Sequence, residues 1–191
     1  MRLVILLVLT ILVGGCSIVQ DGQNASIEDS SAQATDTISG VRDLVLTEED
    51  LRQLGVVGDG CSIEEYVTDE FSPLSQYGFC NYAASALNGT DIVIELHKFT
   101  NEADRNGTYQ YTSSHLYGAK GLISENEYGD QSSLRVNSED DYGAEFNEQG
   151  IYYYHLWFTE DLYLVHITSK GSKDADALIA GIGRRIESKF G

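Results

Sequence analysis

The last forty or so residues, 150–191, constrain the fold of this chain most strongly. Residues 151–158 form an unbroken run of apolar, aromatic and β-prone side chains, a polar break follows at 159–161, and a second such run covers 162–168. Two runs across a short break predict a β-hairpin. From Ser172 onward the apolar residues recur at helical spacing: Leu178, Ile179, Ile182, Ile186 and Phe190. This stripe predicts an amphipathic C-terminal helix that closes a sheet.

The preceding residues predict more of the same α+β fold, an antiparallel β-sheet with helices packed on it. Asn88-Gly89 is a strong tight-turn signal between two strands. Thr47 followed by acidic residues predicts a helix start, and Gly55 predicts its end. Thr100 is expected to cap a second helix at 101–117. The expected strands are 41–46, 61–71, 77–87, 91–99, 134–136 and 142–146.

The N-terminus predicts export and lipid attachment. A positive start, an apolar run over 3–13 and small residues before a cysteine are typical of a signal peptide. Val13-Gly14-Gly15-Cys16 resembles the lipobox of prokaryotic lipoproteins, which implies cleavage after residue 15 and acylation of Cys16. A plain signal or an uncleaved anchor with an incidental cysteine is the alternative. Either way, the domain is expected outside the cytoplasm.

Composition divides the rest of the chain into a tether and one domain. Residues 16–40 are rich in Ser, Gln, Ala, Asp and Thr, which predicts a flexible tether. Residues 41–191 are long enough for a single domain with a substantial core. We therefore expect a signal peptide at 1–15, a tether at 16–40, a domain at 41–191, and attachment to the cell membrane or cell surface through the lipid alone.

Charge and cysteine content narrow the functional classes further. The net charge is −18, and it becomes −19 once residues 1–15 are removed with their single arginine. Such a surface repels nucleic acid, so nucleic-acid partners are not expected. With Cys16 acylated, Cys61 and Cys80 remain as a pair in an oxidising compartment, which predicts a disulfide. The alternative, a free nucleophilic cysteine, lacks a partner residue at any recognisable spacing.

A histidine pair is the sharpest candidate for chemistry. If Phe158 pairs with Tyr163 in the hairpin, His155 lies directly opposite His166, about 5 Å apart at Cβ. Loops of two or four residues are expected to keep this pairing, whereas a three-residue loop would break it. That separation allows two imidazoles to share Zn²⁺ or Cu²⁺, although a third ligand has no assigned position. The alternative is that the two histidines are ordinary hydrogen-bonded residues on an aromatic face. No cofactor is therefore predicted, and a divalent metal ion is the one cofactor that stays open. The same face would carry Tyr153, Trp157 and Leu164.

No motif in the sequence specifies a reaction. The Gly-x-Ser-x-Gly elbow, the His-Glu-x-x-His pair and the Gly-rich phosphate loop are all missing. Glu102, Asp104 and Asn106 imitate half of a calcium-binding loop, but Ser113 stands where its final glutamate belongs, so a helix start explains them better. Tyr152, Tyr153 and Tyr154 must point to both faces of a strand, so sheet packing accounts for most of them.

The order of these segments resembles a broad group of exported domains. This group includes the PsbP-like fold and the lipoprotein or sensor domains akin to LpqN and the extracellular part of PknH. The resemblance covers roughly residues 46–190 and rests on hydrophobic patterns: IVIELHKF, TNEAD, YYYHLWF with LYLVHI, and ADALIAGIGRRIESKF. It implies binding, sensing or assembly rather than catalysis, and it transfers no functional residue.

Together these observations predict a lipid-anchored extracytoplasmic domain that binds or senses without catalytic activity. Its expected partners are the membrane, through Cys16, and an unidentified envelope protein or small ligand. Two alternatives stay open. One is an exported metal-dependent or hydrolytic enzyme that uses His155 and His166, and the other is a structural envelope lipoprotein.

Overall fold

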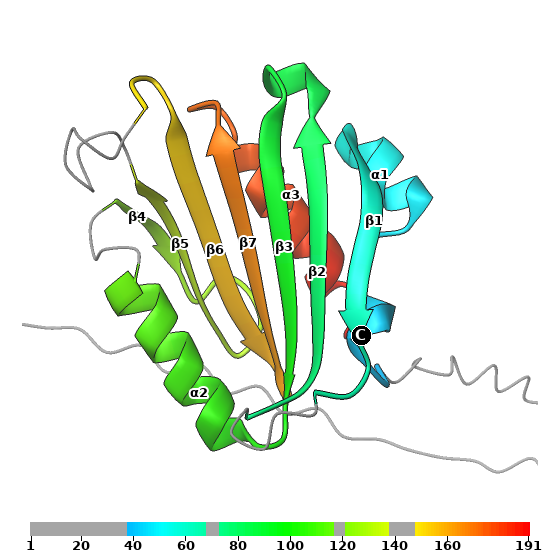
Figure 1. The fold of residues 1–191 in the computed structure, drawn as a ribbon. Helices are drawn as coiled ribbons and strands as arrows, with labels where there is room; N and C mark the ends of the chain where they lie inside the picture. The colour runs from blue at the N-terminus through cyan, green and yellow to red at the C-terminus, as the bar shows by residue number, and fades with distance from the viewer. Residues whose placement is uncertain (1–37, 68–72, 117–120, 138–147) are drawn as a thin grey trace, which may run out of the picture. The chain divides into compact units, whose positions relative to one another are not determined.

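The computed structural model describes residues 38–67, 73–116, 121–137 and 148–191. Within them, seven strands form one antiparallel sheet in the order β1-β2-β3-β7-β6-β5-β4 (Figure 1). The strands are β1 (Val56–Glu64), β2 (Leu74–Ala84), β3 (Thr90–Phe99), β4 (Leu122–Glu125), β5 (Gln131–Asn137), β6 (Tyr152–Glu160) and β7 (Tyr163–Gly171). The helices are η1 (Val41–Leu44), α1 (Glu48–Leu54), η2 (Ser85–Leu87), α2 (Glu102–Tyr111), η3 (Thr112–Leu116) and α3 (Asp176–Glu187). The α+β class is confirmed.

Two hairpins that are each followed by a helix form the centre of the fold. The hairpin β2–β3 leads into α2, and the hairpin β6–β7 leads into α3. The two units join where β3 pairs with β7, so both central strands have a neighbour on each edge. The terminal hairpin and the helix after it are confirmed. None of the helices in the described segments has the length and apolar content needed to cross a bilayer.

The two helices lie against opposite faces of the sheet (Figure 1). We call these faces the α3 face and the α2 face. Alternate residues of β3 show the division: Ile92, Ile94 and Leu96 are buried on the α3 face, whereas Glu95 and His97 point to the α2 face. The main core lies between the α3 face and the buried side of α3, which carries Ile179, Ile182 and Ile186.

Gly183 lets α3 approach the sheet closely. A Cβ at this position would lie 2.5 Å from Cδ2 of Leu156 and 3.0 Å from Cε1 of Tyr128. Both neighbours belong to the main core, which is close-packed and has no room for the extra atom. The helix therefore depends on a glycine at its central contact.

A second, smaller core lies on the α2 face. It contains Phe99, Tyr109, Trp157 and Leu164, and Tyr109 is the contribution of α2. The buried Arg105 anchors the helix: its Nη1 donates to Oδ2 of Asp130 at 2.8 Å and to the backbone carbonyl of Asp161. Helix α2 contacts β3, β6 and β7, so it covers only part of this face.

Several expected boundaries are wrong, for local reasons. Residues 41–44 form a 3-10 helix rather than a strand, because the Asp43 carboxylate accepts hydrogen bonds from the backbone N–H groups of Ser39 and Gly40. Asn101, not Thr100, caps α2. Strand β1 starts at Val56 and ends at Glu64, so it is displaced from the expected 61–71.

Other differences concern whole elements. Strand β4 was not expected, and α3 starts at Asp176 rather than near Ser172. Helix α2 ends at Tyr111 and continues as a π-helical turn to Leu116. Glu102–Gly107 lie inside α2, so they do not form a calcium-binding loop. Cys16, the signal peptide, most of the tether and the strand expected at 142–146 lie outside the described residues.

The predicted disulfide is confirmed. Cys61 and Cys80 are directly opposite each other on β1 and β2, with a Cα–Cα distance of 4.1 Å, and the bond links the edge strand to the sheet. The chain-entropy model assigns about 3 kcal/mol to a closed loop of this length.

We expect reduction of this bond to lower the free energy of unfolding by about 3 kcal/mol. Urea unfolding with and without a thiol reductant measures the change. A variant with Cys61→Ser and Cys80→Ser should match the reduced protein and be insensitive to reductant. Equal stability of the oxidised and reduced proteins would contradict the expectation.

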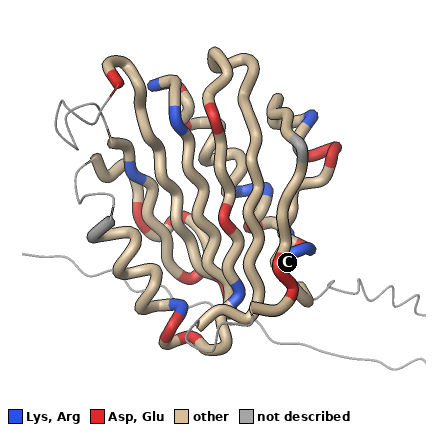
Figure 2. The backbone as a smooth tube through the Cα atoms, viewed as in Figure 1, with Lys and Arg blue, Asp and Glu red and all other residues tan. Residues whose placement is uncertain are grey.

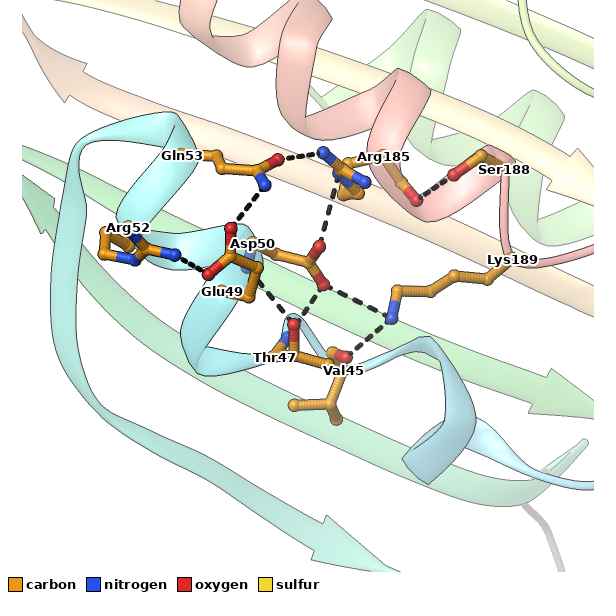
Figure 3. Close-up of polar contacts among 9 residues, drawn as sticks. All are labelled: Val45, Thr47, Glu49, Asp50, Arg52, Gln53, Arg185, Ser188 and Lys189. Carbon is orange, nitrogen blue, oxygen red and sulfur yellow. Dashed lines mark hydrogen bonds and ion pairs between the residues drawn. The ribbon is translucent and has the colours of Figure 1, made fainter.

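A polar clamp fastens α1 to the end of α3 (Figure 3). The buried Asp50 accepts a hydrogen bond from the Thr47 backbone N–H at 2.9 Å, and its carboxylate lies 3.3 Å from Arg185 Nε and 3.5 Å from Lys189 Nζ. Burial alone would raise the pKa of Asp50. The hydrogen bonds from Thr47 and the positive charges of Lys189 and Arg185 outweigh burial and lower the pKa.

Asp50→Asn is expected to cost roughly 1–3 kcal/mol, because the side chain loses the negative charge that pairs with Arg185 and Lys189. Because the folded state lowers the pKa of Asp50, its stabilisation is present above the unfolded pKa and is lost as the pH falls below it. Urea unfolding at neutral and acidic pH tests both statements. Glu49→Gln on the same helix is the matched control, since Glu49 is exposed and its ion pair with Arg52 lies at the surface. An equal effect of the two substitutions would contradict the expectation.

Candidate functional site

A chain of polar side chains crosses the centre of the sheet on the α2 face. It starts on β2, where Tyr77 Oη donates to Glu95 Oε1 at 3.0 Å. Glu95 Oε2 lies 2.8 Å from His166 Nδ1, and these residues are directly opposite each other on β3 and β7. His166 Nε2 then lies 3.2 Å from His155 Nδ1 on β6. Four neighbouring strands therefore supply one connected network.

The pairing of the two histidines differs from the expected one. Trp157 is opposite His166, and His155 is opposite Thr168, so the register is shifted by two residues. The reason is the turn: Glu160 already pairs with Tyr163, which leaves a loop of only Asp161 and Leu162, and Asp161 takes a positive φ of 49°. The expectation that a two-residue loop keeps the pairing is wrong, because a loop shorter by two residues moves each partner by two positions. A shift of two keeps every side chain on its face, so the histidines meet diagonally.

Thr168 completes the contact between the histidines. Its hydroxyl oxygen lies 3.0 Å from His166 Nε2 and 3.4 Å from His155 Nδ1. Both histidines are buried, whereas Thr168 and Glu95 are partly exposed. The network thus has a buried middle and two contacts with solvent.

Trp157 holds both imidazole rings in place. Its ring stacks on His166 at a centroid distance of 4.8 Å and on His155 at 5.2 Å, with interplanar angles of 9° in both cases. Trp157 is fully buried. Tyr153 shares this face but lies toward the end of β6, opposite Lys170, so it stands apart from the histidines. The structure does not describe the side chain of His115.

The surroundings keep two of the histidines neutral and the glutamate charged. Burial lowers the pKa of His155 to about 3, and nearby His166 adds to the effect while Glu95 opposes it. Burial likewise lowers the pKa of His97, which packs against Tyr77 and Phe99, to about 4. The hydrogen bond with His166 lowers the pKa of Glu95 to about 2, although burial acts against it. At neutral pH the site therefore combines a charged, partly exposed Glu95 carboxylate with a neutral, buried His155 imidazole.

The order of carboxylate, imidazole and hydroxyl in Glu95, His166 and Thr168 is that of a hydrolytic triad. Catalysis of acyl transfer also needs donors for the oxyanion. Strand β7 is paired along both edges, so its backbone N–H groups are used in the sheet and are not available as oxyanion donors.

Among the described residues, no group of three or more His, Cys, Asp or Glu side chains is arranged to hold a metal ion.

A groove of about 820 Å³ adjoins this network on the α2 face. It lies over β1, β2, β3 and β7, where the sheet extends beyond the contacts of α2. Its sides are mainly apolar or neutral, with an ionic rim, and its lining includes Val57, Phe79, Asn81, Asp91, Val93 and Lys170. Phe79 is directly opposite Glu95, which joins the groove to the histidine network.

Charge is sparse in the middle of the sheet and concentrated at its margins (Figure 2). At the groove, Asp91 and Lys170 are cross-strand partners at the ends of β3 and β7. Lys170 Nζ also lies 3.4 Å from Glu148 Oε1. The positive charge at the rim is therefore offset by a nearby carboxylate, while Asp91 is exposed.

Sequence reasoning found the two histidines and Trp157 but missed Tyr77, Glu95, Thr168 and the groove. The alternation in residues 91–99 was a usable signal for Glu95, because it separates the polar side of that strand from the apolar side. The pairing of β3 with β7 had no local signal, because about 70 residues separate Glu95 from His166.

No protein-family model matches the sequence, and neither does any curated protein. Among solved structures, the chain is similar to the crystal structure of the extracellular domain of PknH from Mycobacterium tuberculosis. The two are 10% identical with a TM-score of 0.47, and the match covers 77% of this chain and 94% of that chain. A similarity of this size indicates no function.

Proposed function

We propose that this chain is a lipid-anchored extracytoplasmic binding or sensing domain that takes a small organic ligand in the groove on the α2 face. Residues 1–15 act as the signal peptide, Cys16 carries the lipid, and the remainder of 16–40 is the tether. Support for export comes from the lipobox-like sequence and from the Cys61–Cys80 disulfide, since such bonds persist in oxidising compartments.

The groove is the observation that carries the proposal. Its volume of about 820 Å³ lies within the range of about 300–1,000 Å³ typical of small-molecule sites. Phe79 and Val93 supply apolar area, and Asn81 and Asp91 supply the few polar groups that orient a ligand. The central strands beneath it are paired on both edges, so its floor is rigid.

Charge favours a cationic ligand. The chain carries a net charge of −18, which raises the local concentration of cations. Asp91 is exposed at the rim, whereas the neighbouring Lys170 lies against Glu148. A flat aromatic or apolar amine would place its body on Phe79 and its ammonium group at Asp91.

Tyramine and 4-hydroxyphenylacetate are a matched pair of probes for this site, because they share the ring and differ in charge. NMR titration of the full chain should show saturable shifts at Phe79, Val93 and Asp91 with tyramine and weaker shifts with the anion. Asp91→Asn should remove the preference, and Phe79→Ala should weaken both probes. Tyr66→Ala, at an exposed residue outside the groove, is the control. Saturable binding of tyramine outside the groove, or no saturable binding of either probe, would contradict the small-ligand assignment. If neither probe binds and cross-linking shows a protein over the groove, a protein partner is favoured instead.

Lipid attachment is tested separately. Cells expressing the chain should incorporate labelled fatty acid into it, Cys16→Ala should abolish the label, and globomycin should cause accumulation of the unprocessed form. A chain that is processed and released without label would contradict the lipoprotein assignment and leave the groove unaffected.

A further inference from the structure

We propose that His155 Nδ1, His166 Nε2 and Thr168 Oγ1 form a binding site for one divalent transition-metal ion of the Zn²⁺ and Cu²⁺ class, with Glu95 orienting His166. The site lies beside the groove and uses other residues, so it does not depend on the proposed ligand. The two imidazoles and the hydroxyl would occupy three coordination positions of the ion, and water molecules would occupy the remaining ones.

The three atoms have the spacing of a ligand set. They form a triangle with sides of 3.2 Å between the two nitrogens, 3.0 Å from the hydroxyl to His166 and 3.4 Å from the hydroxyl to His155. Tetrahedral Zn²⁺ with bonds of about 2.0–2.1 Å has ligand atoms about 3.3 Å apart. The imidazole rings are within 18° of parallel, with centroids 5.5 Å apart. Binding of one ion requires both rings to turn in plane until the two nitrogens point to it.

The support behind the first ligand is also typical of a metal site. Metal-bound histidines usually donate their second ring N–H to a carboxylate, which sets the tautomer and the ring orientation. Glu95 Oε2 lies 2.8 Å from His166 Nδ1, so it holds Nε2 toward the triangle. Tyr77 fixes the other carboxylate oxygen, and Trp157 stacks on both rings.

Electrostatics are compatible with a cation at this position. The two ring nitrogens lie within hydrogen-bond distance of each other, and a metal ion would replace a proton held between them when it binds. Glu95 supplies a negative charge behind His166. Arg135 is opposite His155 on β5, but its guanidinium lies 3.7 Å from Glu125 and also donates to Ser133. The partly exposed Thr168 marks the side from which an ion and its waters enter.

Nitrogen ligands decide the class of ion. Imidazole suits Zn²⁺, Cu²⁺ and Ni²⁺, whereas Mg²⁺ and Ca²⁺ prefer sets of oxygen ligands. This preference also separates the site from the acidic surface, which attracts any divalent cation.

Calorimetric titration of the full chain with ZnCl₂, after removal of metal by EDTA and with excess Mg²⁺ to occupy the acidic surface, tests the proposal. We expect one Zn²⁺ per chain. His155→Ala should weaken binding beyond detection, and Glu95→Gln should weaken it roughly 10–100-fold, as loss of the carboxylate behind a ligand does. His97→Ala is the matched control, because His97 is a histidine on the same face outside the triangle, and it should leave affinity unchanged.

NMR of the imidazole nitrogens keeps the test independent of folding in the variants. In the unaltered protein, Zn²⁺ should shift His155 Nδ1 and His166 Nε2 and leave His97 in place. Zn²⁺ heats no larger than those of Mg²⁺, affinity that persists in His155→Ala, or unshifted imidazole nitrogens would each overturn the proposal.

Discussion

Lowering the pH from about 7 to about 4 in the presence of EDTA is expected to reduce the free energy of unfolding by a few kcal/mol, because the half-buried His97 and the buried His155 resist protonation. The pKa of His97 is about 4 and that of His155 about 3 in the folded protein, against an ordinary value of 6.5. Below pH 6.5 the unfolded chain therefore binds protons that the folded chain does not. Each unit of pKa difference is worth about 1.4 kcal/mol.

Glu95 extends this loss to lower pH. Its pKa is lowered to about 2, so its stabilisation is present above the unfolded pKa, ordinarily 4.5, and disappears as the pH falls toward 2. All three groups thus act in the same direction, and stability should fall continuously from about pH 6.5 downward.

Urea unfolding at a series of pH values measures the slope. The double variant His97→Gln and His155→Gln should be less stable at neutral pH but should lose less stability on acidification, because its uncharged side chains do not titrate. Glu48→Gln, at an exposed residue of α1, is the control and should keep the original slope. If the double variant shows the same slope as the unaltered protein, His97 and His155 are not the cause.

Trp157→Ala is expected to cost about 3–5 kcal/mol, the usual cost of removing a fully buried large aromatic side chain. Trp157 is completely buried, stacks on both histidines and joins the small core beneath α2. Its removal leaves a cavity and frees the imidazoles to rotate. Chemical unfolding gives the stability, and the imidazole NMR signals report the loss of order in the rings.

Two controls separate burial from stacking. Tyr66→Ala removes an aromatic side chain that is 85% exposed, and it should change stability by less than about 0.5 kcal/mol. Trp157→Leu keeps an apolar side chain but no flat ring, so it should recover part of the stability and none of the ring order. A cost of Trp157→Ala close to that of Tyr66→Ala would show that the small core contributes little.

Local patterns were sufficient for much of the fold. The apolar runs over 151–158 and 162–168 and the stripe from Leu178 to Phe190 correctly predicted a hairpin and a packed helix. Asn88-Gly89 correctly placed the turn before β3, where Asn88 and Gly89 both take positive φ. These features are local because side-chain alternation and turn chemistry depend on neighbouring residues.

Register was harder to predict, as the histidines show. Counting along the hairpin placed His155 on the same face as His166 but opposite the wrong residue, since the turn used two residues rather than four. The face to which each side chain points follows from the alternation along the strand. The exact residue opposite it depends on where the chain reverses. That reversal is set at Asp161, whose backbone carbonyl also holds Arg105 of α2.

By itself, the sequence determined that this chain builds an antiparallel sheet with a terminal helix, links Cys61 to Cys80, and places two histidines on one face with Trp157. Only the tertiary structure decided that α2 and α3 lie on opposite faces, that β3 pairs with β7, and that Glu95 therefore meets His166. The physical reason is range: alternation and helical periodicity act within a few residues, whereas strand order comes from burying both helices against one sheet. That pairing of distant strands places Glu95 behind His166 at the candidate metal site and Asp91 beside Lys170 at the rim of the groove.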